Sequence, residues 1–209
     1  MNIEEFKRKY GHEEGGFWYP RVTAICDILA KPGMEKWLAN SGGYNLMMQK
    51  RKKILNWGSA LDATVKKLFI GESPEVPQFI APSIEAFLKW LKGHKVKVRA
   101  IDKKVISKKH FYAGITDIIA EIDGTLGILD IKASSNIWDE HFMQTAAYCQ
   151  AFNETEPEKV KTHWILRIDQ YQECHKCFAK KREKGEEEIK GENFDCFHQW
   201  SAPRGVCEI

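Results

Sequence analysis

The clearest pattern of apolar positions lies between residues 112 and 132, where two runs rich in Ile and Leu flank the dipeptide Asp123-Gly124. Asp-Gly between strand-like runs favours a two-residue β-hairpin, because a type I′ turn needs two residues that tolerate positive φ. With this turn, Ile122 pairs with Thr125, and the same register sets Asp117 opposite Asp130. The hairpin is therefore expected to bring two aspartates face to face.

Apolar spacing predicts further helices and strands along the chain. Residues Leu61, Val65, Leu68 and Phe69 form one helical stripe, whereas alternating positions indicate strands. Helices are predicted over 19–29, 34–40, 44–69, 82–91 and 141–152, and strands over 96–106 and 160–168. Residues 1–19 are expected to be a loosely ordered lead-in, and 71–82 a loop rich in proline. The mixture predicts an α/β fold.

The composition fits one soluble domain in a reducing compartment. The chain has 209 residues, 43% hydrophobic and 29% charged, which is enough for a sizeable core. Its charged N-terminus is not typical of a secretory signal, and no apolar run approaches the ~18 residues of a membrane helix. We expect a cytoplasmic protein without a membrane partner, whose cysteines are thiols or metal ligands rather than disulfides.

Basic residues gather in two segments, although the net charge is only +3. One is Lys50-Arg51-Lys52-Lys53; the other holds one acid, Asp102, and eight bases: Lys92, Lys95, Lys97, Arg99, Lys103, Lys104, Lys108 and Lys109. Clustered cations suit a phosphate backbone, whereas a lone basic run is usually a solvated face. The two runs favour DNA or RNA as a partner, and the last four lysines are the predicted contacts.

The facing aspartates predict a metal site. Asp117 and Asp130 repel each other on mostly apolar strands, and a cation between them removes that repulsion. Mg²⁺ or Mn²⁺ would take both carboxylates and the carbonyl of Ile131, leaving room for a scissile phosphate and a water made more acidic by the metal. The alternative is an ordinary cross-strand cluster of charges that includes Lys132.

Three further side chains are candidates for catalysis. Lys132 shares the face of Asp130, because side chains alternate along a strand, and could orient the water or neutralise charge on the phosphorus. Gln144 and Tyr148 are four positions apart and meet on one helix face, where both could bond a phosphate or the lysine. The alternative for Tyr148 is a buried core tyrosine.

These residues resemble the motifs of the PD-(D/E)xK nuclease superfamily, in its RecB-like branch of mitochondrial genome maintenance exonucleases, CRISPR adaptation nucleases and phage exonucleases. The similar segments are Tyr19-Pro20-Arg21-Val22-Thr23, Trp57-Gly58-Ser59-Ala60-Leu61-Asp62, Gly114-x-x-Asp117, Asp130-Ile131-Lys132 and Gln144-x-x-x-Tyr148. The resemblance covers about residues 19–168 of a single domain over 1–209, which leaves 169–209 as a C-terminal extension with a charged loop at 180–192.

The resemblance implies a restriction-endonuclease-like fold, with a mixed central sheet flanked by helices and the active site at its splayed edge. It implies an exonuclease, dependent on Mg²⁺ or Mn²⁺, that hydrolyses phosphodiester bonds at the ends of single- or double-stranded DNA. Its role would be in recombination, repair or end processing. Its partner would be a recombination protein or a single-strand-binding protein, and its source would be a phage. The implied DNA contacts are Arg21, Thr23, Ser59 and Ser134.

Two positions depart from the family pattern. Asp62 stands where the branch usually has a metal-binding His; Asp is a competent oxygen ligand, and the preference could move from Mn²⁺ toward Mg²⁺. The alternative for Asp62 is a solvent-facing helix residue. Arg21 stands where the first motif usually has Ser, and its guanidinium could hold a terminal phosphate instead.

The cysteines leave three alternatives open. Some relatives carry an iron–sulfur cluster on one Cys before the core and three after it, and this chain has Cys26 before, with Cys174, Cys177, Cys196 and Cys207 after. Zinc held by Cys174, Cys177, Cys196 and His198 is equally consistent with the spacing. The third alternative is reduced thiols. Cys149 is expected in the core.

The function predicted from the sequence is a metal-dependent DNA nuclease, and more specifically an exonuclease. One alternative is a catalytically inactive nucleic-acid-binding protein that retains the fold. Another is a binding module stabilised by zinc or an iron–sulfur cluster in the C-terminal extension.

Overall fold

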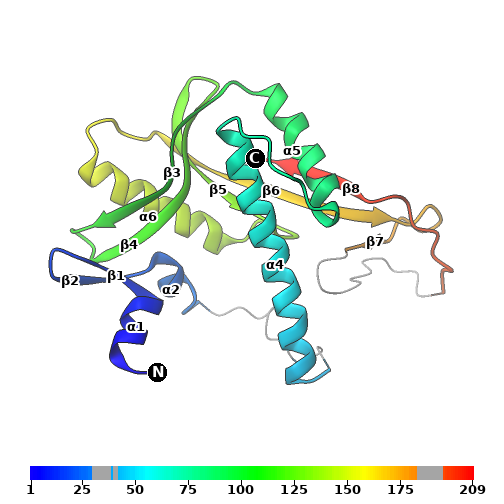
Figure 1. Ribbon diagram of the computed structural model, residues 1–209, viewed down its shortest axis with the longest axis horizontal. Helices are drawn as coiled ribbons and strands as arrows, with labels where there is room; N and C mark the ends of the chain where they lie inside the picture. Colours follow the sequence, from blue (N-terminus) through cyan, green and yellow to red (C-terminus); the bar gives the residue numbers. More distant parts are fainter. Residues whose placement is uncertain (30–38, 40–41, 183–194) are drawn as a thin grey trace.

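Helices cover both faces of one central β-sheet in the computed structural model, which describes residues 1–29, 39, 42–182 and 195–209 (Figure 1). The predicted α/β class, with a mixed sheet flanked by helices, is therefore confirmed. Among these residues, no helix has both the length and the apolar character needed to cross a membrane.

The sheet is mixed because one of its strand pairs is parallel. Its strands follow the order β3–β4–β5–β6–β7, and β8 also pairs with β6. Their bounds are β3 Val96–Ser107, β4 Tyr112–Ile122, β5 Thr125–Lys132, β6 Thr162–Glu173, β7 Lys180–Lys181 and β8 Arg204–Glu208. The parallel pair is β5 with β6, and helix α6 (Asp139–Thr155) supplies the crossover that parallel strands require.

The predicted hairpin is confirmed, as is its register. Asp123 and Gly124 have φ values of 50° and 86°, as a type I′ turn requires. The ladder between β4 and β5 runs from Ile122 opposite Thr125 to Ile118 opposite Leu129. Asp117 and Asp130 are the next residues beyond that last pair.

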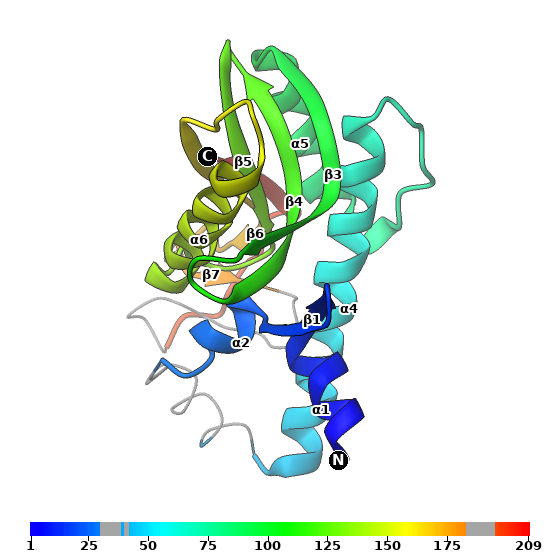
Figure 2. The ribbon, with the colours of Figure 1, turned by 90° about the vertical axis from the view of Figure 1, so that its left-hand side faces the viewer.

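Helices lie on each face of the sheet (Figure 2), and each face has its own core. Helices α4 (Tyr44–Phe69) and α5 (Ala81–Gly93) pack Leu61, Val65 and Phe87 on one face. On the other face, α6 and the short α2 (Val22–Cys26) pack Phe152 and Val22 over β4 and β5. The predicted helix over 44–69 has these bounds, and those over 82–91 and 141–152 lie inside α5 and α6.

The lead-in predicted over 1–19 is wrong, because these residues form regular elements. Helix α1 (Ile3–Tyr10) is capped by Asn2, because the side chains of Asn2 and Glu5 each accept a hydrogen bond from the other's backbone N–H. Strands β1 (Gly11–Glu14) and β2 (Phe17–Pro20) then form a hairpin around two glycines with positive φ. Both signals, a capping box and a Gly-Gly turn, were present in the sequence.

Other predicted bounds need smaller corrections. The helix over 19–29 is restricted to α2, because Tyr19 and Pro20 belong to β2. The loop over 71–82 contains the short helix η1 (Gln78–Ile80), and α5 already begins at Ala81 because proline suits the first helical turn. The strand over 160–168 starts at Thr162 and reaches Glu173. The helix over 34–40, apart from residue 39, and most of the charged loop over 180–192 lie outside the described residues.

Candidate active site

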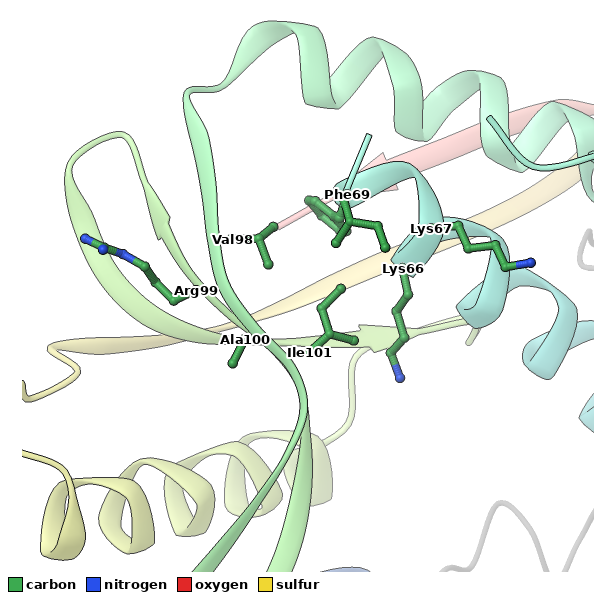
Figure 3. A pocket seen from close by; sticks show the side chains of 8 residues that line it. Lys66, Lys67, Phe69, Val98, Arg99, Ala100 and Ile101 are labelled. Atoms are coloured by element: carbon green, nitrogen blue, oxygen red, sulfur yellow. The ribbon is translucent and has the colours of Figure 1, made fainter. Parts of the chain in front are cut away.

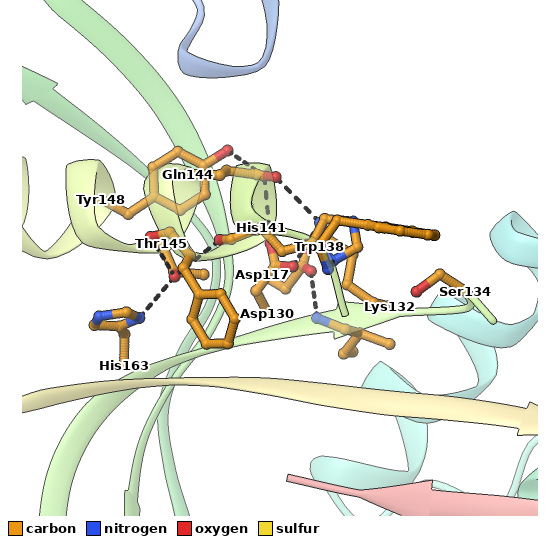
Figure 4. Close-up of polar contacts among 12 residues, drawn as sticks. Asp117, Asp130, Lys132, Ser134, Trp138, His141, Gln144, Thr145, Tyr148 and His163 are labelled. Atoms are coloured by element: carbon orange, nitrogen blue, oxygen red, sulfur yellow. Dashed lines mark hydrogen bonds and ion pairs between the residues drawn. The ribbon is translucent and has the colours of Figure 1, made fainter. Parts of the chain in front are cut away.

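Asp117 and Asp130 lie where the β4–β5 ladder stops (Figure 4). Asp117 Oδ2 accepts a hydrogen bond of 2.8 Å from the backbone N–H of Ile131, so a side chain takes the place of the next backbone partner. Asp130 is 2% exposed, under α6. The end of the hairpin therefore presents two carboxylates, one of them inside the protein.

Lys132 and Gln144 complete a network around Asp130. Lys132 Nζ lies 2.5 Å from Asp130 Oδ2 and donates to Gln144 Oε1 at 3.2 Å. Gln144 Nε2 lies 3.3 Å from Asp130 Oδ1 and 2.8 Å from the hydroxyl oxygen of Tyr148, so one amide joins the strand to the helix. The structure thus brings together all five residues predicted as catalytic. Asp117 belongs to the group because its side chain accepts the backbone N–H of Ile131, the residue between Asp130 and Lys132.

Gly114 makes room for Tyr148. A Cβ at position 114 would lie 2.2 Å from Tyr148 Cε1, which no side chain tolerates. The tyrosine is 3% exposed, and burial raises the pKa of its hydroxyl. The glycine of the Gly114-x-x-Asp117 segment therefore has a packing reason: it lets the tyrosine ring lie against β4, with its hydroxyl at Gln144.

Burial changes the acidity of Asp130. Removal from water raises the pKa of its carboxyl to about 6; Lys132 opposes this rise and the charge on Asp117 adds to it. The Oδ2 atom accepts no hydrogen bond of normal geometry, although it contacts Lys132 as an ion pair. A buried carboxylate oxygen in this state has capacity for another positive partner.

Lys66 of α4 binds a second group of acids and was missed at the sequence level. Its Nζ lies 2.9 Å from Asp62, 2.7 Å from Asp102 and 3.2 Å from Asp117. Burial acts to lower the pKa of Lys66, but these carboxylates raise it above its ordinary value. Burial and Asp117 raise the pKa of Asp62. The spacing Asp62-x-x-x-Lys66 was a usable signal for this pair.

Asp102 is the other missed residue. It lies between Ile101 and Lys103, whose partners on β4 are Ile118 and Thr116, so it faces Asp117 across the strands. The site therefore holds four carboxylates, of Asp62, Asp102, Asp117 and Asp130, against the two ammonium groups of Lys66 and Lys132. With all groups ionised, its negative charge favours binding of a further cation.

A hollow of about 640 Å³ borders this group (Figure 3). It lies between the end of α4 and the first half of β3, and its lining includes Lys66, Phe69 and Ile101. Because Lys66 also contacts Asp117, the hollow adjoins the carboxylates without containing the predicted catalytic residues.

Four of the eight predicted DNA contacts bind other groups of the protein. Lys103 pairs with Glu156 at 2.7 Å, and Lys104 pairs with Glu14 of β1. Arg21 donates to the carbonyl of Arg8 at 3.1 Å, and Ser134 to that of Asn136 at 2.6 Å. Exposed side chains are those of Thr23, Ser59, Lys108 and Lys109.

Arg167 of β6 holds the loop that follows Lys132. Its Nη1 donates to the carbonyl oxygens of Ser135 at 3.3 Å and Ser134 at 3.5 Å. Its Nε pairs with Glu208 of β8 at 2.5 Å. The C-terminal strand is thereby linked to the loop beside the candidate site, which the sequence did not indicate.

A second cluster forms at the far end of β6. The ligand atoms of Cys174, Cys177, Cys196 and His198 all lie within 4.8 Å of one another, so this group could bind a metal such as Zn²⁺. Burial acts to raise the pKa of Cys174, but backbone N–H groups and the His198 ring outweigh it and lower the pKa to about 5. Cys26 and Cys207 pack against the two cores instead, and Cys149 packs as predicted.

A scan against protein-family models gives no match, and a search of curated proteins gives none. Function is therefore inferred from the geometry of the site and from the motifs in the sequence.

Proposed function

We propose that the chain is a metal-dependent deoxyribonuclease. Specifically, we propose an exonuclease that acts at DNA ends in recombination, repair or end processing. The observation that carries this proposal is the contact network of Asp130, Lys132 and Gln144 beside Asp117, at the end of a hairpin. The motifs similar to the PD-(D/E)xK superfamily, and its restriction-endonuclease-like fold, belong to the same proposal.

The residues present fit a divalent cation such as Mg²⁺ or Mn²⁺. Asp117 and Asp130 offer only oxygen atoms, the ligand type that hard cations prefer, and the buried Oδ2 of Asp130, which contacts Lys132 as an ion pair, accepts no hydrogen bond of normal geometry. Asp117, Asp130 and the carbonyl of Ile131 would hold the cation, with Asp62 nearby. When bound, it would supply positive charge to the scissile phosphate and raise the acidity of a water.

The protein's own side chains would do the remaining work. The ammonium of Lys132 is positioned by Asp130 and Gln144, so its charge would lie beside a phosphate that accumulates negative charge. Gln144 donates to the Tyr148 hydroxyl oxygen, which fixes its amide. The fixed amide in turn restricts the conformations of the Lys132 side chain. Such fixed donors stabilise a transition state because they need little reorganisation during the reaction.

Exposed basic side chains would bind the DNA backbone. Arg51, Lys52 and Lys53 lie in the N-terminal half of α4, whose buried residues all come from position 57 onward. Lys108 and Lys109 are exposed at the turn between β3 and β4. Both groups could contact phosphates without breaking an ion pair of the core.

One assay tests the proposal. DNA labelled at its 5′ or 3′ end, single- or double-stranded, is incubated with Mg²⁺, Mn²⁺ or chelator. We expect cleavage that needs the metal and is lost in Asp130→Asn. The variant Glu121→Gln, which removes a carboxylate of β4 near the hairpin turn that pairs with Arg99, should cleave like wild type. Absence of cleavage of every substrate, with either metal, would refute the proposal.

The contacts of Lys66 favour a second candidate, a nucleic-acid-binding protein without catalysis. Its ammonium already neutralises Asp117 together with Asp62 and Asp102, as a bound cation would. This candidate requires DNA binding that is unaffected by chelator and by Asp130→Asn. Gel-shift measurements with the same labelled DNA distinguish the two candidates.

A further inference from the structure

The cluster of three cysteines and one histidine joins two segments that are distant in sequence. Cys174 follows the last residue of β6, and Cys177 lies in the turn after it. Cys196 and His198 belong to the segment that leads into β8. The ligands therefore come in two pairs, spaced Cys-x-x-Cys and Cys-x-His, with eighteen residues between Cys177 and Cys196.

The first pair lies in a turn shaped around a sulfur atom. The backbone N–H of Lys176 donates to Cys174 Sγ at 3.4 Å, and the N–H of Phe178 donates to the carbonyl of Cys174 at 3.0 Å. Phe178, directly after the second cysteine, has a φ of 60°, a left-handed conformation that a phenylalanine seldom adopts. The N–H donor stabilises negative charge on the sulfur, and thiolate is the form that binds metal.

The second pair is held against the first by the backbone. Cys174 forms a β-bridge with Trp200, and the N–H of His175 donates to the carbonyl of Gln199 at 2.9 Å. The ring of His198 lies 4.7 Å from that of Trp200, tilted by 34°. The imidazole of His198 thus packs against Trp200, and its Nδ1 lies near the sulfur atom of Cys177.

The distances match one ion rather than a disulfide or an iron–sulfur cluster. Cys174 Sγ lies 4.0 Å from Cys196 Sγ, and Cys177 Sγ lies 3.3 Å from His198 Nδ1. Tetrahedral zinc, with bonds of about 2.3 Å to sulfur and about 2.0–2.1 Å to nitrogen, separates such ligands by roughly 3.5–3.8 Å. A disulfide needs about 2.05 Å between sulfurs, and the common clusters need four thiolates.

The described residues around the cluster form only a small apolar core. Phe178 and Phe197 are 71% and 91% exposed, and β7 contributes only two residues to the sheet. Of the residues near the cluster, Cys174 and Ala179 are buried. A segment with so small an apolar core commonly depends on a metal or a disulfide for its stability.

We propose that Cys174, Cys177, Cys196 and His198 form a closed structural zinc site that fastens the C-terminal segment to the end of β6. Four protein ligands leave no position for substrate, which is typical of structural rather than catalytic zinc. The fastened segment continues into β8, where Gly205 lies so close to α5 that a Cβ would lie 1.8 Å from the carbonyl oxygen of Pro82. Zinc would thereby keep β8 in register on β6.

Metal analysis of the full chain tests the site. The protein is produced without a histidine tag, purified under reducing conditions and measured by mass spectrometry for bound metals. We expect about one zinc per chain in wild type and in Cys149→Ser, and less than about a tenth in Cys177→Ser and Cys196→Ser. Iron in place of zinc, a Cys174–Cys196 disulfide, or full zinc content in both cluster variants would overturn the proposal.

A cobalt titration decides the matter if the serine variants do not fold. Wild-type protein stripped of zinc should bind one Co²⁺ and develop the absorption of a tetrahedral thiolate complex, which zinc then removes. Absence of this absorption would refute the site.

Hydrogen exchange tests the role of the zinc separately from its presence. Removal of zinc with a strong chelator should raise exchange rates in residues 199–208 by at least about tenfold, equivalent to ~1.4 kcal/mol, and leave the β4–β5 hairpin unchanged. Equal rates in β8 with and without zinc would show that the ion does not fasten this strand.

Discussion

Lys66 Nζ lies 3.2 Å from Asp117 Oδ1, so an ammonium group of α4 pairs with a carboxylate that we propose as a ligand of the divalent cation. Lysine and metal therefore compete for the same carboxylate. Lys66→Met should lower the free energy of unfolding without metal by about 1–3 kcal/mol, because three acids lose their partner.

The same substitution should strengthen Mg²⁺ binding roughly tenfold, or ~1.4 kcal/mol, because one positive charge leaves the site. Thermal unfolding and calorimetric titration with Mg²⁺ measure the two effects. Lys67→Met, the exposed neighbour on the same helix, is the matched control. If both variants behave alike, Lys66 does not compete with the metal.

Asp117→Asn should reduce DNA cleavage by more than about tenfold, or ~1.4 kcal/mol in barrier terms, with the fold retained. The amide keeps an oxygen that can accept the N–H of Ile131 but removes the charge that a cation needs. Single-turnover cleavage at saturating DNA measures the loss, and Glu121→Gln on the same strand serves as control. Activity above a tenth of wild type would refute the assignment of Asp117 as a metal ligand.

Gly114→Ala should reduce both stability and activity, because the new methyl group would lie 2.2 Å from the ring of Tyr148. We expect a loss of about 1–3 kcal/mol in the free energy of unfolding, as for other overpacked sites. Displacement of the ring would also break the hydrogen bond that Gln144 Nε2 donates to the Tyr148 hydroxyl oxygen. Gly93→Ala, where nothing lies within 4 Å of the added Cβ, is the control. Equal stability of the two variants would contradict the packing role.

Local patterns in the sequence predicted the centre of the candidate site. A two-residue turn determines the register of its strands, so the positions of Asp117 and Asp130 followed from Asp123-Gly124. Gln144 and Tyr148 followed equally from helical spacing. Each prediction needed only residues close in sequence.

The remaining residues depend on contacts that the sequence does not specify locally. Asp102 faces Asp117 through a β3–β4 register that includes an irregularity between Val98 and Ala100, and no short turn signal determines it. Lys66 reaches the strands because α4 packs on one face of the sheet through its core contacts. Strand β8 returns to β6 after a segment rich in charge, so its hydrophobic pattern gave little indication of its partner.

Lys108 and Lys109 should contribute to DNA affinity rather than to chemistry. Replacing both by Gln should weaken binding of every DNA sequence and lower the slope of log K against log salt by up to about 0.9 for each phosphate that is no longer neutralised. Lys103→Gln is the comparison, because that lysine is paired with Glu156 and lies over the ring of Phe152. An unchanged salt dependence in the double variant would show that this turn points away from DNA.

Asp62 tests how the chain departs from the nuclease family that it resembles. Its carboxylate lies 2.9 Å from Lys66 Nζ and is 36% exposed, so it can turn toward a cation without opening the core. Asp62→Ala should raise the metal concentration needed for half-maximal cleavage roughly 10- to 100-fold. Asp62→His should introduce the ligand that is commoner in that family and favour Mn²⁺ over Mg²⁺ in the cleavage reaction, since imidazole suits the softer ion. Asn56→Ala, at an exposed position of the same helix, is the control. Metal titrations that superimpose for wild type and both Asp62 variants would make Asp62 a surface residue that pairs with Lys66 and has no part in metal binding.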